Sequence, residues 1–91
     1  MPDTYRIRYA SRRVAKEIMD LPPEIFSRID KVIMRLRKDP RPPGCRKLHS
    51  QAIGQYRLRV GDWRVIYDVD DVANEVILLR IMHRRQIYRQ R

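Results

Sequence analysis

Residues 55–67, QYRLRVGDWRVIY, are the stretch from which the rest of the chain can be placed. Gly61-Asp62 at its centre is a two-residue hairpin signal, because glycine takes the positive φ that such tight turns require. The stretch therefore predicts two antiparallel strands with the turn between them. In that register Arg59 lies directly opposite Arg64.

Side chains alternate between the two faces of a strand, so the hairpin has two different faces. One face collects apolar and aromatic residues that we expect in the core: Tyr56, Leu58, Val60, Trp63, Val65 and Tyr67. The other face carries Arg57, which lies opposite Ile66, together with Arg59 and Arg64. Like charges that face one another destabilise a sheet, which favours a site that needs a strong positive potential. The alternative is a solvated face, although such a face more often mixes its charges.

A strand and two helices are predicted before the hairpin. Residues 4–9 alternate at period two and form the strand. Ser11 can cap a short helix over residues 11–20. Pro22-Pro23 ends this helix and opens a second one over about residues 24–38, where apolar residues follow helical spacing. The apolar stripes of both helices need a surface to cover, so we expect a helical hairpin packed on the sheet.

The remaining segments flank the hairpin on both sides. Residues 39–54 are rich in proline and glycine and are expected to be irregular, with Leu48 as an anchor in the core. After a turn at residues 70–74, residues 75–82 form a strand that is apolar on both faces and is therefore expected at the centre of the sheet. The tail, residues 83–89, leaves the sheet with concentrated positive charge.

The order β-α-α-β-β-β with a short C-terminal tail predicts an α+β fold. We expect one domain over residues 1–91, because a chain of this length does not accommodate a second one. Its antiparallel sheet should contain about four strands, including the first one, with the two-helix hairpin packed on one face.

Composition points to the kind of partner. The net charge of +10 and the pI near 10.6 favour a polyanion, or an acidic protein that masks the charge. Cys45 is the only cysteine, and His49 and His83 lack the spacing of metal ligands, so we expect no metal and no other cofactor. No signal peptide and no apolar run of membrane-spanning length is present, so we expect a cytoplasmic protein without a membrane partner.

Three segments resemble the RelE/ParE toxin superfamily: YRLRVGDWRVIY, the tail HRRQIYR, and Leu48-His49 followed by Gly54 just upstream of the hairpin. The resemblance covers essentially the whole chain. It implies a RelE-like toxin of a type II toxin–antitoxin system, a ribosome-dependent mRNA endonuclease that inhibits translation. Two alternatives remain: a ParE-like gyrase-directed toxin on the same scaffold, and a non-catalytic basic nucleic-acid-binding module.

The resemblance also implies a mechanism and a set of residues. In such metal-free ribonucleases the ribose 2′-OH attacks the adjacent phosphorus in line. Arg59 and Arg64 would hold the phosphate, since guanidinium groups bind its oxygens bidentately, and Arg84 would complete the clamp. Tyr88 matches the family's tail tyrosine, which stacks on a base or takes part in proton transfer. Further RNA contacts are expected from Arg57, Lys47, Arg85 and Arg89.

One departure from the family leaves the general base open. Family members carry lysines where this chain has Arg57 and Arg59, and arginine does not give up its proton. Proton transfer is therefore expected from the tail, from His83 or Tyr88. The alternative for His83 is a strand-end histidine bonded to the backbone. Trp63 could stack on a base, but its position in the strand favours the core.

The resemblance further implies partners. These are the ribosome with its mRNA, and a cognate antitoxin that neutralises the toxin. We expect the antitoxin to offer an acidic or amphipathic segment that folds on binding. This segment would cover the arginine face or displace the tail that bears Tyr88.

Overall fold

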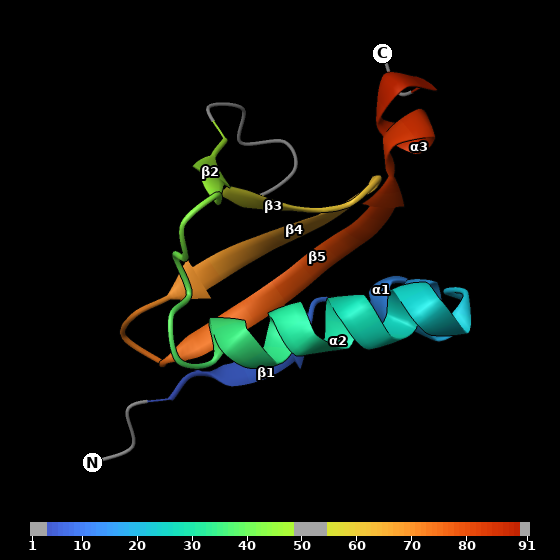
Figure 1. Ribbon diagram of the computed structural model, residues 1–91. Helices are drawn as coiled ribbons and strands as arrows, with labels where there is room; N and C mark the ends of the chain where they lie inside the picture. The colour runs from blue at the N-terminus through green and yellow to red at the C-terminus, as the bar shows by residue number, and fades with distance from the viewer. Residues whose placement is uncertain (1–3, 49–54, 90–91) are drawn as a thin grey trace.

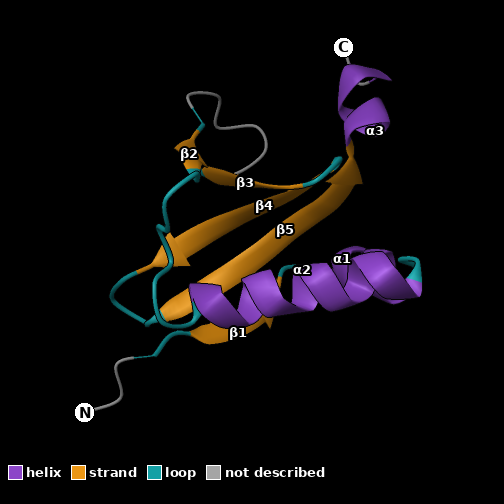
Figure 2. Ribbon diagram, in the orientation of Figure 1, coloured by secondary structure: helices purple, strands orange, loops and turns teal. Residues whose placement is uncertain are grey.

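The computed structural model describes residues 4–48 and 55–89, the last three of them through their backbone only, and shows a sheet with two helices on one face (Figures 1 and 2). Along the chain the elements are β1 (Arg6–Tyr9), α1 (Arg12–Met19), α2 (Pro23–Leu36), β2 (Arg46–Lys47), β3 (Tyr56–Val60), β4 (Trp63–Asp70), β5 (Glu75–His83) and α3 (Arg84–Arg89). The expected α+β class is confirmed. No helix in the described part of the chain is long and apolar enough to cross a membrane.

The sheet has the order β1-β5-β4-β3-β2 and is mixed rather than wholly antiparallel. β2 to β5 pair antiparallel, whereas β1 pairs parallel to β5. The expectation of an antiparallel sheet is therefore wrong for β1. The periodicity of β1 carries no information on its direction, because β1 reaches its neighbour through both helices and three strands instead of through a turn. The fifth strand, β2, is a two-residue segment within the stretch that was expected to be irregular.

The hairpin of β3 and β4 has the predicted register. Arg59 pairs with Arg64 and Arg57 pairs with Ile66. The pair Val60–Trp63 closes the two-residue turn. Gly61 has a φ of +60°, and it is the only turn residue of this hairpin with a positive φ. This is the arrangement of a type II′ turn, which places glycine at the first central position.

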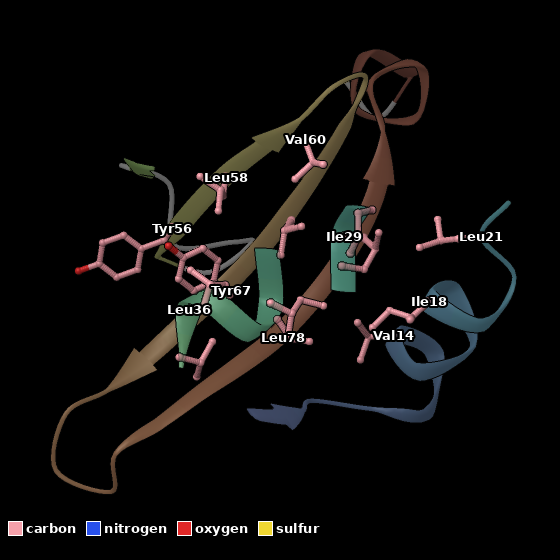
Figure 3. Packing of buried hydrophobic residues seen from close by; sticks show 14 residues of the cluster. Val14, Ile18, Leu21, Ile29, Leu36, Tyr56, Leu58, Val60, Tyr67 and Leu78 are labelled. Atoms are coloured by element: carbon pink, nitrogen blue, oxygen red, sulfur yellow. The ribbon is translucent and has the colours of Figure 1, made fainter. Parts of the chain in front are cut away.

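Both helices bury most of the predicted apolar stripes against the sheet, whereas Phe26 of α2 is exposed. α1 packs on β5 and α2 on β3, and the buried cluster between the layers is shown in Figure 3. It consists of Val14, Ile18, Leu21, Ile29, Ile33, Leu36, Tyr56, Leu58, Val60, Val65, Tyr67, Val76, Leu78 and Ile81. Pro23 opens α2 as expected. Ser11 occupies the N-cap position of α1, but its side chain makes no capping hydrogen bond.

β5 lies between β1 and β4, so its expected central place is confirmed. Met82 is buried on the face opposite the helices, where it pairs with Arg64. Beyond the end of β1 the edge of β5 is covered by α1. There the Ile81 N–H donates to Oε1 of Glu17 at 3.0 Å, and Nε of Arg80 donates to Oε2 at 2.9 Å. A side chain thus takes the place of a neighbouring strand.

The proline-rich loop between α2 and β2 is held by polar contacts as well as by packing. Tyr67, which is fully buried and stacks on Tyr56 with ring centroids 5.6 Å apart, donates its hydroxyl to the Pro40 carbonyl at 2.8 Å. Burial raises the pKa of Tyr67, so the hydroxyl keeps its proton. Cys45 packs against the core from this loop, and Leu48 is half-buried.

Candidate functional site

Three elements meet at one end of the sheet. The tip of the β3–β4 hairpin, the end of β5 and the start of α3 lie together, at the opposite end from the N-terminus (Figure 1). The backbone N–H of Arg84 donates to the Asp62 carbonyl at 2.7 Å, and Nη1 of Arg84 lies 3.7 Å from Oδ1 of Asp62. Trp63 pairs with His83 in the neighbouring strand. We call this region the hairpin-tip site, formed by Arg59, Gly61, Asp62, Trp63, Arg64, His83 and Arg84.

The two opposed arginines converge on one oxygen. Nε of Arg59 donates to the Gly61 carbonyl at 3.3 Å, and Nη1 of Arg64 donates to the same carbonyl at 3.2 Å. Nη1 of Arg64 also donates to the Trp63 carbonyl at 3.1 Å. Arg59 is exposed and Arg64 half-buried. A phosphate at this point would meet guanidinium donors from both strands. Its anionic oxygens would accept these hydrogen bonds more strongly than the carbonyl does.

A third guanidinium group, from α2, was missed in the sequence. A Cβ on Gly61 would lie 3.3 Å from Nη2 and 3.4 Å from Nη1 of Arg28, so this group packs against the open side of the glycine. The hairpin and Arg28 are more than thirty residues apart in the sequence. The sequence pattern of α2 indicates only that Arg28 is exposed. It does not predict the contact between Arg28 and Gly61.

His83 serves the backbone at the start of α3. Its Nδ1 accepts the backbone N–H of Arg85 at 3.2 Å, and its own N–H donates to Oε1 of Gln86 at 2.7 Å. Because Nδ1 is occupied as an acceptor, the neutral ring carries its proton on Nε2. The geometry is that of the alternative expected for His83, a strand-end histidine bonded to the backbone.

Trp63 lies between the site and the core. It is half-buried and packs against the core cluster, as its position in the strand indicated. Its ring meets the imidazole of His83 edge-on, with centroids 5.1 Å apart. Trp63 therefore contacts both the core and His83.

The other expected RNA contacts are spread more widely. Arg57 is half-buried on the arginine face and pairs with Arg46 of β2, so a second pair of like charges faces across strands. Lys47 is exposed in β2, and Arg85 is exposed in the first turn of α3. The expectations for the side chains of Tyr88 and Arg89, and those for His49 and Gly54, lie outside what the structure describes.

Away from this site, an ionic clasp ties four segments together at the other end of the sheet. Nη2 of Arg41 donates to Oδ2 of Asp71 at 2.7 Å, and the Tyr5 hydroxyl donates to Oδ1 of Asp71 at 2.7 Å. Nε of Arg41 donates to the Tyr56 hydroxyl at 2.9 Å. The hydrogen bonds from Arg41 and then from Tyr5 lower the pKa of the Asp71 carboxyl. The clasp holds the loop that leads into β2.

The comparisons with known proteins agree with this fold. Residues 8–88 match a family model described as the ParE toxin of a type II toxin–antitoxin system, parDE. The chain therefore belongs to this family, within the RelE/ParE superfamily, and is a type II toxin. The resemblance found in the sequence is confirmed.

Particular relatives share nearly the whole chain. It is 32% identical over 91 residues to Toxin RelG of Mycobacterium tuberculosis. The alignment covers 99% of this chain and 100% of that protein. The RelE–RelB complex of Pyrococcus horikoshii OT3 aligns with a TM-score of 0.76 and 29% identity over 89% of this chain and 96% of that one. The RelBE2 complex of M. tuberculosis aligns with a TM-score of 0.75 and 25% identity over 88% of this chain and 98% of that one.

Proposed function

We propose that this toxin is a ribosome-dependent mRNA endonuclease of the RelE type. The observation that carries the proposal is the convergence of Arg59 and Arg64 on the Gly61 carbonyl oxygen, at 3.3 Å and 3.2 Å. Two fixed positive charges aimed at one point are suited to a phosphate whose negative charge grows during reaction. The RelE and RelG names among its relatives support the same assignment.

The proposed reaction is an in-line attack of a ribose 2′-oxygen on the adjacent phosphorus. The new O2′–P bond forms as the P–O5′ bond breaks, which gives a 2′,3′-cyclic phosphate and a free 5′-OH. One group must take the 2′-OH proton and another must protonate the leaving 5′-oxygen. Arg59 and Arg64 would stabilise the phosphoryl oxygens, and Arg84, which lies beside the hairpin tip, would add a third donor.

Proton transfer remains assigned to the tail. His83 in its present tautomer has no free acceptor nitrogen, because Nδ1 accepts the Arg85 N–H and Nε2 carries the proton. It could act as base only after releasing that hydrogen bond. We therefore favour Tyr88 over His83 as the residue that exchanges a proton with the substrate.

The proposed protein partner is a cognate antitoxin. Relatives of this chain are found in complexes named RelBE and RelE–RelB. With a net charge of +10, this chain would be neutralised most directly by an acidic or amphipathic segment that covers the arginine face.

The test is to map transcript ends after expression of the toxin, with and without active translation. We expect new 5′-OH ends within translated messages, and we expect them to vanish when translation is blocked. Arg59→Gln and Arg64→Gln should each lower cleavage by about 10²–10³. Leu58→Ala, on the core face, should instead lower the free energy of unfolding by about 2–4 kcal/mol.

The description of the matching family as ParE favours one other candidate, a gyrase-directed toxin. That function predicts inhibited DNA supercoiling and intact messages. Supercoiling assays with purified gyrase, run beside the transcript mapping, separate the two. Intact messages together with blocked supercoiling would overturn the endonuclease proposal.

A further inference from the structure

Helix α2 places two arginines on the side that faces the hairpin. Arg28 and Arg35 are seven residues apart, which is close to two helical turns, so they lie on one side of the helix about 10 Å apart. Both are exposed, and neither makes a hydrogen bond or ion pair with any described residue. Arg28 reaches Gly61 at the hairpin tip, 3.3 Å from the position of a Cβ there.

Arg35 borders a groove between α2, the proline-rich loop and β3. The groove has a volume of about 260 Å³ and is lined by Val32, Arg35, Pro42, Pro43, Leu58 and Arg59. Its walls combine apolar side chains with two guanidinium groups, and no acidic side chain of the described residues lines it. The loop that forms one wall is held by the clasp of Arg41 and Asp71, at 2.7 Å.

Arg59 belongs to both regions, because it lines the groove and also donates to the Gly61 carbonyl at the hairpin-tip site. Arg59 therefore connects the proposed cleavage point with the groove beside α2. A chain of phosphates bound at Arg59 and Arg64 would meet Arg28 or Arg35 next. Guanidinium planes also stack on unpaired bases, and the prolines, Val32 and Leu58 offer an apolar wall to a ribose or base.

We propose that the groove between α2 and β3 is a second subsite for single-stranded RNA. It would hold a nucleotide next to the cleaved phosphate, with Arg28 and Arg35 on the backbone phosphates. The proposal rests on the proposed function in one respect, that RNA is the substrate. It adds Arg28 and Arg35 of α2 to the residues expected to bind RNA. The sequence pattern of the hairpin does not predict either of them.

The test measures binding without cleavage. A fluorescent 2′-O-methyl RNA hexamer lacks the attacking hydroxyl, so it is bound but not cut. Binding constants are measured between about 50 and 200 mM salt for wild type, Arg28→Gln and Arg35→Gln. Arg12→Gln is the matched control, because Arg12 is an exposed arginine on α1, which packs on β5 rather than on β3.

Each lost phosphate contact lowers the slope of log K against log salt by about 0.7 for a single strand. We expect that reduction for Arg28→Gln and for Arg35→Gln, and none for Arg12→Gln, with equal melting temperatures in all four proteins. Unchanged slopes in both Arg28→Gln and Arg35→Gln would overturn the proposal. So would slopes that fall equally in all three variants, which would indicate general charge alone.

Two further results are informative. One distinguishes an RNA subsite from a protein-binding surface, and the other separates failure of the endonuclease proposal from failure of RNA binding in the groove. If Arg28→Gln and Arg35→Gln keep the wild-type RNA slope but weaken the complex with the cognate antitoxin, the groove is a protein-binding surface and the RNA subsite is wrong. If the predicted slopes are found in a toxin that leaves messages intact, the groove binds RNA but is not a subsite for cleavage, and the endonuclease proposal fails.

Discussion

His83 shows how one residue type can be read in two ways. A histidine beside arginines in a proposed nuclease suggests a general base, yet here its Nδ1 accepts the Arg85 N–H at 3.2 Å. His83 immediately precedes α3, so this bond is an N-cap, and asparagine can make the same bond. The substitution His83→Asn therefore keeps the cap and removes the titratable ring.

We expect His83→Asn to cleave at nearly the wild-type rate, and Tyr88→Phe to lose about 10²–10⁴-fold, the usual contribution of a positioned acid or base. Single-turnover cleavage of ribosome-bound mRNA across pH gives the measurement. A phenol base starts from a pKa of about 10, so the wild-type rate should still climb above neutrality.

His83→Ala serves as the control, because it removes both the cap and the ring. It should destabilise α3 by about 0.5–2 kcal/mol, which circular dichroism can follow. A large loss of cleavage in His83→Asn, with α3 intact, would instead make His83 the proton-transfer residue.

At the scale of single elements, the edge of β5 depends on one carboxylate. Glu17 accepts the Ile81 N–H at 3.0 Å and pairs with Arg80 at 2.9 Å, in a half-buried setting. Removal of the carboxylate leaves a backbone donor and a guanidinium group without this acceptor.

We expect Glu17→Ala to lower the free energy of unfolding by about 1–3 kcal/mol in urea titrations. Lys16→Ala is a matched control on the same helix, because the Lys16–Asp20 pair is exposed on both sides and should contribute little. Equal effects of the two substitutions would show that the edge contact does not stabilise β5.

The clasp between the proline-rich loop and the β4–β5 turn predicts a dependence on pH. The pKa of Asp71 is lowered in the folded protein, by Arg41 first and Tyr5 second. The clasp's stability is therefore fully present above the ordinary carboxyl pKa of about 3.9, and it is lost as pH falls further through the folded value.

The difference in unfolding free energy between wild type and Asp71→Asn should be constant near neutrality and shrink below about pH 4. Denaturant titrations at several pH values measure it. Asp20→Asn, in an exposed helical pair, provides the comparison. A difference that stays constant through the acid range would rule out a contribution from the charge of Asp71.

At the scale of the whole molecule, charge dominates the expected behaviour. The net charge of +10 is spread along the chain, and arginines face one another at Arg59–Arg64 and at Arg46–Arg57. The positive charges on such a surface repel one another, and an anionic partner would reduce this repulsion. We infer that the proposed antitoxin binds in part by masking this charge.

The affinity of the toxin for its cognate antitoxin should fall steeply between low and moderate salt, because ions screen charges over about 10 Å at 0.1 M. Calorimetric titration at several salt concentrations measures this, and Arg59→Gln should flatten the dependence more than Arg12→Gln. An affinity that is independent of salt would show that apolar contact alone holds the complex.

The sequence by itself determined the features that local periodicity encodes. Alternation along residues 56–67 fixed the hairpin register and the two faces, and the helical stripes fixed what α1 and α2 bury. The opposition of Arg59 and Arg64 follows from the same pattern, because a two-residue turn leaves no other pairing. The hairpin and its arginine pair were therefore predicted residue by residue.

Only the tertiary structure decided what depends on contacts between distant segments. The parallel direction of β1, the approach of Arg28 to Gly61 and the groove at Arg35 join parts of the chain that have no common periodicity. The cap made by His83 required α3 to form, which a short, highly charged tail does not signal. Packing sets these arrangements, because the direction and distance of two elements follow from the shapes they bury together and not from either sequence alone.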